Sequence, residues 1–258
     1  MWEVHLKNGQ ALVLLSLWML TLGWASGDDP GSVPDYTATA LAAEGRPAED
    51  RDRDEGRKPG QVLAFLGIEP GDRVAELMSG KGWYVEILSR VVGPKGQVFA
   101  HNSPFVLERF AEGALSTRLK NPDLANVTRI NADLDKMKLP DGLDAVMIVL
   151  FYHDTYWQKV DRAKMNAEVF ASLKPGGVYG IIDHSAEPGS GDRDVYTLHR
   201  VDEALVKQEI LAAGFVLDGE SDLLANPKDT RDYNVFRDVR TNRDNTDRFI
   251  LRFKKPMN

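Results

Sequence analysis

The sequence predicts a doubly wound α/β fold, in which a mostly parallel sheet carries helices on both faces. The first observation is a strand, a glycine turn, a helix and a second strand in succession over residues 72–102, which is a βαβ unit. The second is that strands and helices continue to alternate after it, so that right-handed crossovers are expected. The third is Asp144–Leu150, an almost continuous apolar run that is typical of a strand buried in a parallel sheet.

The βαβ unit is defined by its apolar runs and its glycines. Arg73–Leu77 has the character of a buried strand, and Met78–Gly82 is a short turn that contains glycine. Trp83–Val92 has apolar residues at helical spacing, and a Gly-Pro pair follows it as a stop signal. Gln97–Ala100 is the second strand. Glycines let a ligand approach the backbone, and the start of the helix offers free N–H groups to an anion.

The remaining elements follow from the same periodicities. Charge alternates over Ala48–Lys58, which favours a short helix ahead of a second helix over Gln61–Leu66. The next elements are expected as a helix over Val106–Lys120, a strand over Val127–Asn131, a helix over Val160–Leu173 and a turn over Lys174–Gly177. The last elements are expected as a strand over Val178–Ile182, a helix over Val201–Ala213, a strand region over Phe215–Leu224 and a final strand over Arg248–Phe253.

Composition limits the classes of function. The chain has 258 residues with 43% hydrophobic and 28% charged residues, which suits a globular protein with a large core. The net charge of −7 argues against nucleic acid as a partner, because phosphate binding needs a basic surface. The absence of cysteine excludes disulfides, thiolate metal sites and a cysteine nucleophile.

The first residues predict export. Ala11–Gly23 is apolar but shorter than the ~20 residues that a membrane span needs. We therefore expect a signal peptide over residues 1–27, a linker over residues 28–47 and a single domain over residues 48–258. The mature protein would be periplasmic or secreted, without stable membrane association, and an uncleaved segment would instead anchor it to the membrane.

A family resemblance appears in the glycine turn and near the end of the chain. The segment RVAELMSGKG resembles motif I of the class I S-adenosylmethionine-dependent methyltransferases, an acid and an apolar residue followed by G-x-G-x-G. Glu76 takes the position of the acid, Gly80 and Gly82 take the last two glycines, and Met78 stands in place of the first. The LKPGG and AAGF segments are also similar to the family, and the similarity covers residues 61–255.

This resemblance implies a Rossmann-like sheet of seven strands in the order 3-2-1-4-5-7-6, with strand 7 antiparallel and helices on both faces. The motifs AELMSGKGWY, FYHD and DHSA look like a bacterial branch of predicted methyltransferases that carries a signal peptide. The implied cofactor is S-adenosylmethionine, and the implied activity is methyl transfer by an enzyme.

The resemblance also implies where the cofactor binds. In open α/β sheets, ligands lie beyond the carboxyl ends of the strands. In the family, the loop after the first strand holds the methionine part, and residues after the second and third strands reach the ribose and the adenine. The implied cofactor residues in this chain are Glu76, Ser79, Gly80, Gly82, Asn102 and Asp133. Asp133 could instead be a turn or cap residue.

Candidate catalytic residues follow the fourth and fifth strands. Histidine has a pKa of about 6.5 in water, which suits proton removal near neutrality. His153 is therefore the candidate base, oriented by Asp154 or Tyr152, and His184 follows the fifth strand as a further catalytic candidate.

A second group of polar residues lies at the expected start of the helix that follows the fifth strand, beyond a flexible loop over Glu187–Asp194. Here His199 and Arg200 are candidates, with Tyr152, to bind an acidic substrate group. A metal site is the alternative reading of the histidines, because imidazole and carboxylate are ordinary ligands. Its members would be His153, Asp154, Asp183 and His184. A third possibility is that these histidines and carboxylates are ordinary loop residues whose hydrogen bonds are unrelated to function.

Residues 225–247 form a long polar stretch, in which Tyr233, Phe236 and Arg237 are expected to cover a substrate.

The sequence thus predicts methyl transfer from S-adenosylmethionine to a small polar acceptor, at oxygen, with the acceptor as the only partner expected. Two alternatives stay open. One is a degenerate, non-catalytic ligand-binding protein of the same fold, suggested by Met78, Asn102 and the export signal. The other is a metal-assisted enzyme that uses the histidine cluster.

Overall fold

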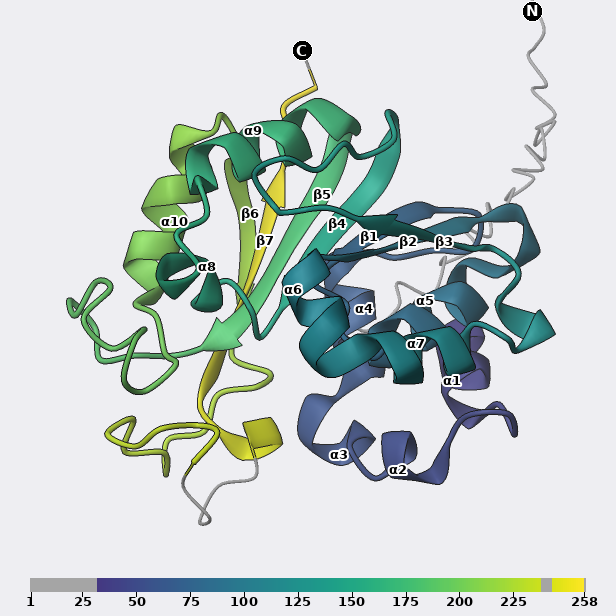
Figure 1. The fold of residues 1–258 in the computed structure, drawn as a ribbon, viewed down its shortest axis with the longest axis horizontal. Helices are drawn as coiled ribbons and strands as arrows, with labels where there is room; N and C mark the ends of the chain where they lie inside the picture. Colours follow the sequence, from purple (N-terminus) through teal and green to yellow (C-terminus); the bar gives the residue numbers. More distant parts are fainter. Residues whose placement is uncertain (1–31, 238–242, 258) are drawn as a thin grey trace, which may run out of the picture.

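A seven-stranded sheet runs through the centre of the computed structural model, which describes residues 32–237 and 243–257 (Figure 1). The strand order is β3-β2-β1-β4-β5-β7-β6, and β7 is antiparallel to both of its neighbours. The strands are β1 (Arg73–Leu77), β2 (Gln97–Asn102), β3 (Val127–Asn131), β4 (Leu143–Val149), β5 (Leu173–His184), β6 (Val216–Ser221) and β7 (Arg248–Lys254). The expected topology is confirmed.

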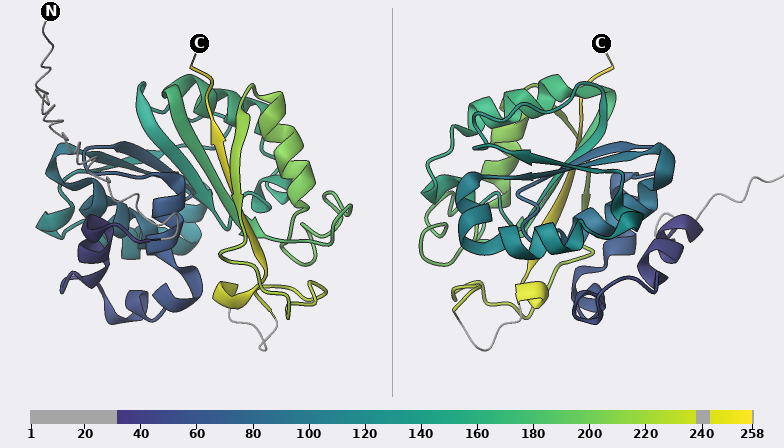
Figure 2. Two further views of the ribbon diagram at one scale, coloured as in Figure 1. Left: turned by 180° about the vertical axis from the view of Figure 1, so that it is seen from behind. Right: turned by 45° about the vertical axis from the view of Figure 1, so that its right-hand side comes forward.

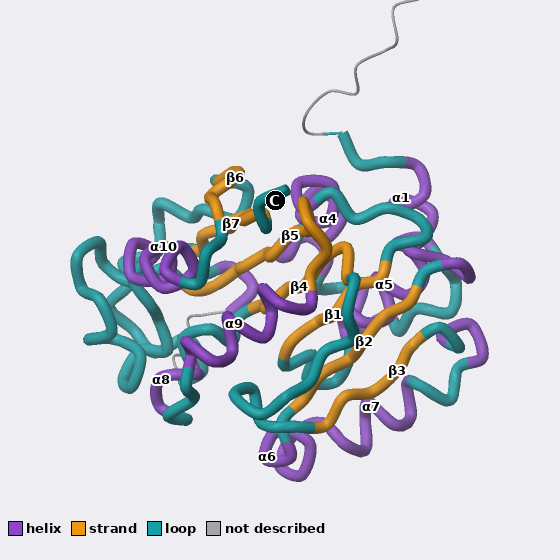
Figure 3. Tube along the Cα trace, turned by 90° about the horizontal axis from the view of Figure 1, so that it is seen from above, coloured by secondary structure: helices purple, strands orange, loops and turns teal. Residues whose placement is uncertain are grey.

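Helices cover both faces of the sheet (Figure 3). One face carries α1 (Asp35–Ala42), α4 (Pro59–Leu66) and α5 (Trp83–Val92), and the other carries α6 (Pro104–Val106), α7 (Glu112–Arg118), α8 (Asp154–Trp157), α9 (Arg162–Ser172) and α10 (Glu203–Ala212). The remaining helical pieces are α2 (Ala48–Arg51), α3 (Asp54–Arg57), η1 (Gly93–Lys95), the π-turn η2 (Leu107–Ala111), η3 (Pro122–Leu124) and η4 (Arg243–Asn245).

The alternation of side chains along each strand divides the core into two layers. Val74 packs with Leu63 of α4 and Ile87 of α5 on one face. Leu77 packs with Leu115 of α7 on the other face, in the cluster that also contains the buried residues of α9 and α10. Both faces of the central strands are therefore covered, which explains why their sequences read as continuous apolar runs.

β5 begins earlier than the sequence predicts. Residues 174–177, expected as a turn, continue the strand from Leu173 to His184. The pairing with β4 shifts register between Leu143 and Ala145, and Gly176 has a φ of +76°. A bulge of this kind takes up extra residues without ending the strand, and glycine supplies the left-handed backbone.

The expected linker is wrong for residues 35–42, which form α1. Thr37 and Ala40 of this helix are buried, and Tyr36 donates a hydrogen bond to the carbonyl of Ile68 at 3.3 Å. Because α1 packs on α4 and α5, tertiary contacts stabilise a helix whose own sequence has little amphipathic pattern.

Helices α2 and α3 lie at the same end of the molecule as the C-terminal segment that carries η4 (Figures 1 and 2). Asp244 of η4 joins the two parts, because it accepts hydrogen bonds from Arg53 at 2.7 Å and from Arg57 at 2.8 Å. The predicted signal peptide lies outside the described residues. Among the residues that are described, no helix is both long enough and apolar enough to cross a membrane.

Candidate functional site

The turn between β1 and α5 has an unusual backbone. Gly80 and Gly82 have φ values of +58° and +84°, and Met78, which occupies the first glycine position, has a φ of +54°. A left-handed backbone at a non-glycine residue is strained and is concentrated at functional sites. A Cβ atom added to Gly80 would meet no atom of the described residues within 4 Å. The turn thus leaves open space in front of Gly80.

Asn102 at the end of β2 holds this turn in place. Its Oδ1 accepts a hydrogen bond from the backbone N–H of Gly80 at 2.8 Å, and its Nδ2 donates to Ser79 Oγ at 3.0 Å. The side chain is fully buried. The predicted cofactor residues of the turn and of β2 are therefore in contact, but the amide of Asn102 faces the turn itself.

Glu76 is a buried acid at the end of β1. Burial raises its pKa to about 8, and the nearby guanidinium of Arg57 only partly offsets this rise. Its Oε2 is buried without a hydrogen-bond partner in the described structure. An ammonium group of a ligand would satisfy this oxygen and would favour the charged carboxylate. Asp133, in contrast, is exposed and pairs with Lys136 at 2.8 Å, as a turn residue does.

His101 on β2 is a residue of the site region that the sequence analysis missed. Its Nδ1 accepts from the N–H of Met78 at 3.4 Å, and its Nε2 lies 3.0 Å from the carbonyl oxygen of Ala132. The ring is therefore the neutral tautomer with its proton on Nε2. Burial lowers the pKa of His101 to about 4. This buried imidazole connects the strained turn to the loop after β3.

The low pKa of His101 predicts a pH dependence of stability. The unfolded chain takes up a proton near pH 6.5, whereas the folded chain takes it up only near pH 4. The folded state therefore loses stability as the pH falls from 6.5 to 4, by about 3 kcal/mol at pH 4. Urea unfolding from pH 7 to pH 4 checks this: His101→Gln should have the shallower profile. Parallel profiles for the two proteins would contradict the prediction.

His153 follows β4 and is fully buried. Its Nδ1 lies 2.7 Å from Asp183 Oδ1, and its backbone N–H donates to the other oxygen of Asp183 at 2.7 Å. Burial lowers the pKa of His153, but the carboxylates of Asp183 and Asp154 outweigh it and raise the pKa to about 10. A ring that is buried and keeps its proton at neutral pH is poorly suited to accept one from a substrate.

Asp154 brings His199 into the same cluster. Its Oδ1 lies 3.1 Å from His153 Nε2 and 2.9 Å from His199 Nδ1, and Trp157 donates to it from Nε1 at 2.6 Å. The side chain of His199 is 23% exposed. Two residues that are 45 positions apart in the sequence thus meet at the end of β4, and His199 is the histidine of the cluster that reaches solvent.

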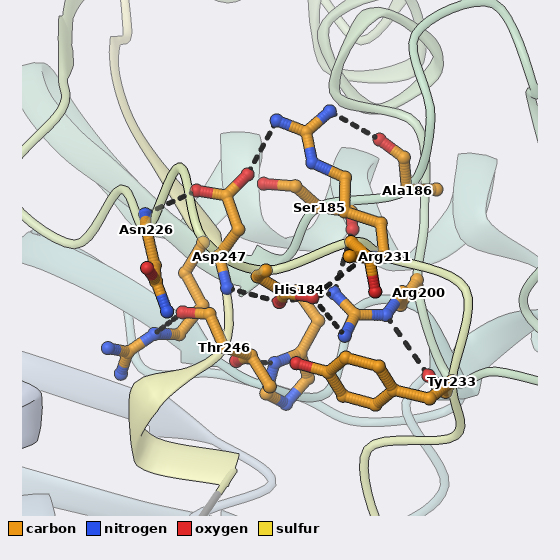
Figure 4. Close-up of polar contacts among 12 residues, drawn as sticks. His184, Ser185, Ala186, Arg200, Asn226, Arg231, Tyr233, Thr246 and Asp247 are labelled. Atoms are coloured by element: carbon orange, nitrogen blue, oxygen red, sulfur yellow. Dashed lines mark hydrogen bonds and ion pairs between the residues drawn. The ribbon is translucent and has the colours of Figure 1, made fainter. Parts of the chain in front are cut away.

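The other predicted site residues have partners inside the fold. The hydroxyl of Tyr152 donates to Glu209 at 2.7 Å, toward the side of α9 and α10. His184 Nδ1 lies 2.6 Å from Thr246 Oγ1 (Figure 4). Arg200 is fully buried against Asp229, at distances of 3.0 and 3.1 Å. For Tyr152 and Arg200, this geometry favours structural roles over the predicted substrate contacts.

Comparison with known proteins gives two kinds of relationship. A scan against known protein families finds no family that matches the chain. The ubiquinone/menaquinone biosynthesis C-methyltransferase UbiE of Ectopseudomonas mendocina is 30% identical over 133 residues, which cover 50% of this chain and 48% of that protein. UbiE of Vibrio parahaemolyticus is 27% identical over 136 residues, covering 52% and 50%. The chain thus spans about half the length of the curated relatives it matches.

Solved structures match over most of the chain. A SAM-dependent methyltransferase from Aquifex aeolicus has a TM-score of 0.57 and 21% identity, with 81% of this chain and 97% of that chain covered. The glycopeptide N-methyltransferase MtfA, complexed with sinefungin, has a TM-score of 0.56 and 17% identity, with coverage of 84% and 90%. The chain has the class I methyltransferase fold. The fold that motif I and the later motifs imply by resemblance is confirmed.

In this methyltransferase fold, aromatic side chains lie beside the polar cluster. The ring of Phe236 is 4.7 Å from that of His199, edge to face. Phe105 of α6 lies 6.2 Å from Trp157 of α8 and 6.0 Å from Phe110, and both phenylalanines are exposed. Phe236 thus packs against His199 of the polar cluster, and its role in covering a substrate stays a prediction.

Proposed function

We propose that the chain transfers a methyl group from S-adenosylmethionine to a small polar acceptor, at an oxygen atom. The observation that carries the proposal is the open left-handed turn at Gly80, at the carboxyl end of β1 in a methyltransferase sheet. Ligands of open α/β sheets bind at this edge. The related UbiE proteins, named as C-methyltransferases, support the class of reaction.

The residues of the turn fit the cofactor. S-adenosylmethionine carries an ammonium group, and Glu76 offers a buried oxygen without a hydrogen-bond partner in the described structure. Gly80 allows the ligand to approach the backbone, and Asn102 and Ser79 fix the shape of the turn. When bound, the cofactor supplies an activated methyl group. The protein contributes by positioning that methyl against the acceptor.

Asp154 and His199 are the residues that we propose for the acceptor. Their side chains are 11% and 23% exposed, whereas the side chain of His153 is inaccessible. A hydroxyl group of the acceptor could exchange hydrogen bonds with either of them. Oxygen is favoured over nitrogen because the end of β4 reads Phe151-Tyr152-His153-Asp154 and lacks the Asn/Asp-Pro-Pro-Tyr pattern that amino-group methyltransferases carry there.

Methylation at carbon is the second candidate. The name of the UbiE relatives specifies C-methylation in quinone biosynthesis. The exposed rings of Phe105 and Phe110 would suit an aromatic acceptor with a polar substituent. The position of the new methyl group on a product, read by mass spectrometry and NMR, distinguishes the two candidates.

Calorimetric titration of the full chain with S-adenosylmethionine and S-adenosylhomocysteine tests the cofactor site. Gly80→Arg should weaken binding about tenfold or more, because the side chain fills the open space and strains the turn. Gly71→Arg is the matched control, since Gly71 also has a positive φ, +96°, and open space around it, but precedes β1 at the opposite edge. Absence of binding to the unchanged protein, or equal binding by both variants, would refute the proposal.

A further inference from the structure

The polar cluster at the end of β4 has the composition of a metal site. Ligand atoms from His153, Asp154 and His199 all lie within 4.8 Å of one another. Two imidazoles and one carboxylate are a common ligand set for zinc and for iron(II), and they leave further coordination positions open. We propose that these three residues bind a divalent transition-metal ion. This inference goes beyond the proposed function, which requires no metal. With an ion bound, Asp154 Oδ1 and His199 Nδ1 would be its ligands, and an acceptor hydroxyl would bind at an open coordination position of the ion.

The distances within the cluster agree with coordination of one ion. Asp154 Oδ1 is 3.1 Å from His153 Nε2 and 2.9 Å from His199 Nδ1. Bonds of ~2.1 Å at angles between 90° and the tetrahedral value separate neighbouring ligand atoms by about 3.0 to 3.4 Å. An ion bound by Asp154 and either histidine therefore requires little movement of those two side chains, and the two ring nitrogens lie within 4.8 Å of each other.

The hydrogen bonds of His153 orient its ring as a metal ligand. Asp183 Oδ1 lies 2.7 Å from Nδ1 and holds a proton there, so that Nε2 faces the cluster. A metal ion that binds Nε2 would displace the proton that this nitrogen carries at neutral pH without metal. Nε2 is buried and has no hydrogen-bond partner among the described residues, although Asp154 Oδ1 lies 3.1 Å away. A carboxylate behind a metal-bound histidine is the usual support for such a ligand. A bound metal would satisfy this nitrogen.

His199 is held toward the cluster by a strained backbone. Its φ is +56°, which non-glycine residues adopt rarely and at a cost. The ring of Phe236 packs edge to face on it at 4.7 Å and lies 6.4 Å from the ring of His153. One side of the proposed site is thus apolar, and the exposed part of His199 gives an ion access from solvent.

The ligand set differs from the one that the sequence suggested. Asp183 and His184 were members of that set, but Asp183 supports His153 from behind, and His184 lies against Thr246. His199, expected to contact the substrate, takes their place. Two nitrogen ligands favour zinc, iron(II), manganese or nickel over magnesium, which prefers oxygen ligands.

Metal binding can be tested without the methyl donor. The full chain, treated with chelator and dialysed, is titrated calorimetrically with Zn²⁺ and separately with Mn²⁺. We expect one site, with affinity reduced at least tenfold by His199→Gln and by Asp154→Asn. His101→Gln is the control, because it makes the same substitution in a histidine outside the cluster. Circular dichroism confirms that each variant is folded.

A second measurement identifies the ligands directly. Co²⁺ added to the unchanged protein should give visible absorption bands of a site with nitrogen ligands and fewer than six ligands, and these bands should vanish in His199→Gln. No binding by the unchanged protein, or binding that His199→Gln retains, would overturn the proposal and leave the cluster as a hydrogen-bonded network. Titration with S-adenosylmethionine is independent of this result, so failure of the metal site and failure of the cofactor site are distinguishable.

Discussion

Replacing Arg200 by methionine is expected to lower the free energy of unfolding by about 3 to 5 kcal/mol, because it leaves a buried carboxylate without its cation. Both side chains of the Arg200–Asp229 pair are 0% exposed. The guanidinium also donates to the carbonyls of Ser185 at 3.1 Å and Tyr233 at 3.3 Å (Figure 4). Arg200 therefore joins the end of β5 to the segment that follows β6. Urea unfolding at pH 7 measures the loss.

Arg193→Met is the matched control for this prediction. Arg193 pairs with Asp194 at 2.7 Å, but its side chain is 63% exposed. An exposed ion pair contributes about 0 to 1 kcal/mol, because water screens the charges. The double variant Arg200→Met/Asp229→Asn should lose less than the sum of its single variants, since it removes the stranded charge while keeping an acceptor. A cost of Arg200→Met no larger than that of Arg193→Met would contradict the prediction.

The fold could be predicted because its signals are local. The apolar run of β4 and the succession of strand, turn and helix at residues 72–102 are read from neighbouring residues. The sheet order is what the family resemblance of motifs near the strands implies. Helix α1 could not be predicted, because its segment has the composition of a linker. Tertiary contacts stabilise it, namely burial of Thr37 and Ala40 against other helices and the hydrogen bond from Tyr36 to Ile68.

The contacts of the site were less predictable, because they join residues far apart in the sequence. The sequence places Asp154 and Asp183 in one cluster with His153, but it does not indicate that the two carboxylates contact the ring closely enough to raise its pKa. His199 meets Asp154 across 45 residues, and Arg200 meets Asp229 across 29. A histidine next to an arginine in a loop is equally compatible with a substrate contact and with these internal contacts.

Replacing Asp183 by alanine is expected to lower the free energy of unfolding by about 3 to 5 kcal/mol. Its buried carboxylate accepts three hydrogen bonds, two from His153 and one from the backbone N–H of His184 at 2.8 Å. Without this carboxylate, the buried N–H groups lose their acceptor, at a cost of about 1 to 3 kcal/mol each. Thermal and urea unfolding measure the effect. Asp161→Ala is the control, because it removes an exposed helix cap that accepts one hydrogen bond from Lys164, and should cost about 1 kcal/mol.

The variant Asp183→Asn distinguishes two roles of the Asp183 carboxylate, orienting His153 as a metal ligand and stabilising the fold. The amide keeps one acceptor oxygen, so the loss of stability should be smaller than in Asp183→Ala. The affinity for Zn²⁺ should still fall about 10- to 100-fold, because a neutral partner no longer holds the His153 ring with Nδ1 protonated and Nε2 available. Asp161→Ala should leave this affinity unchanged. Asp183→Asn with full zinc affinity would mean that the carboxylate stabilises the fold at the end of β5 without supporting a metal ligand.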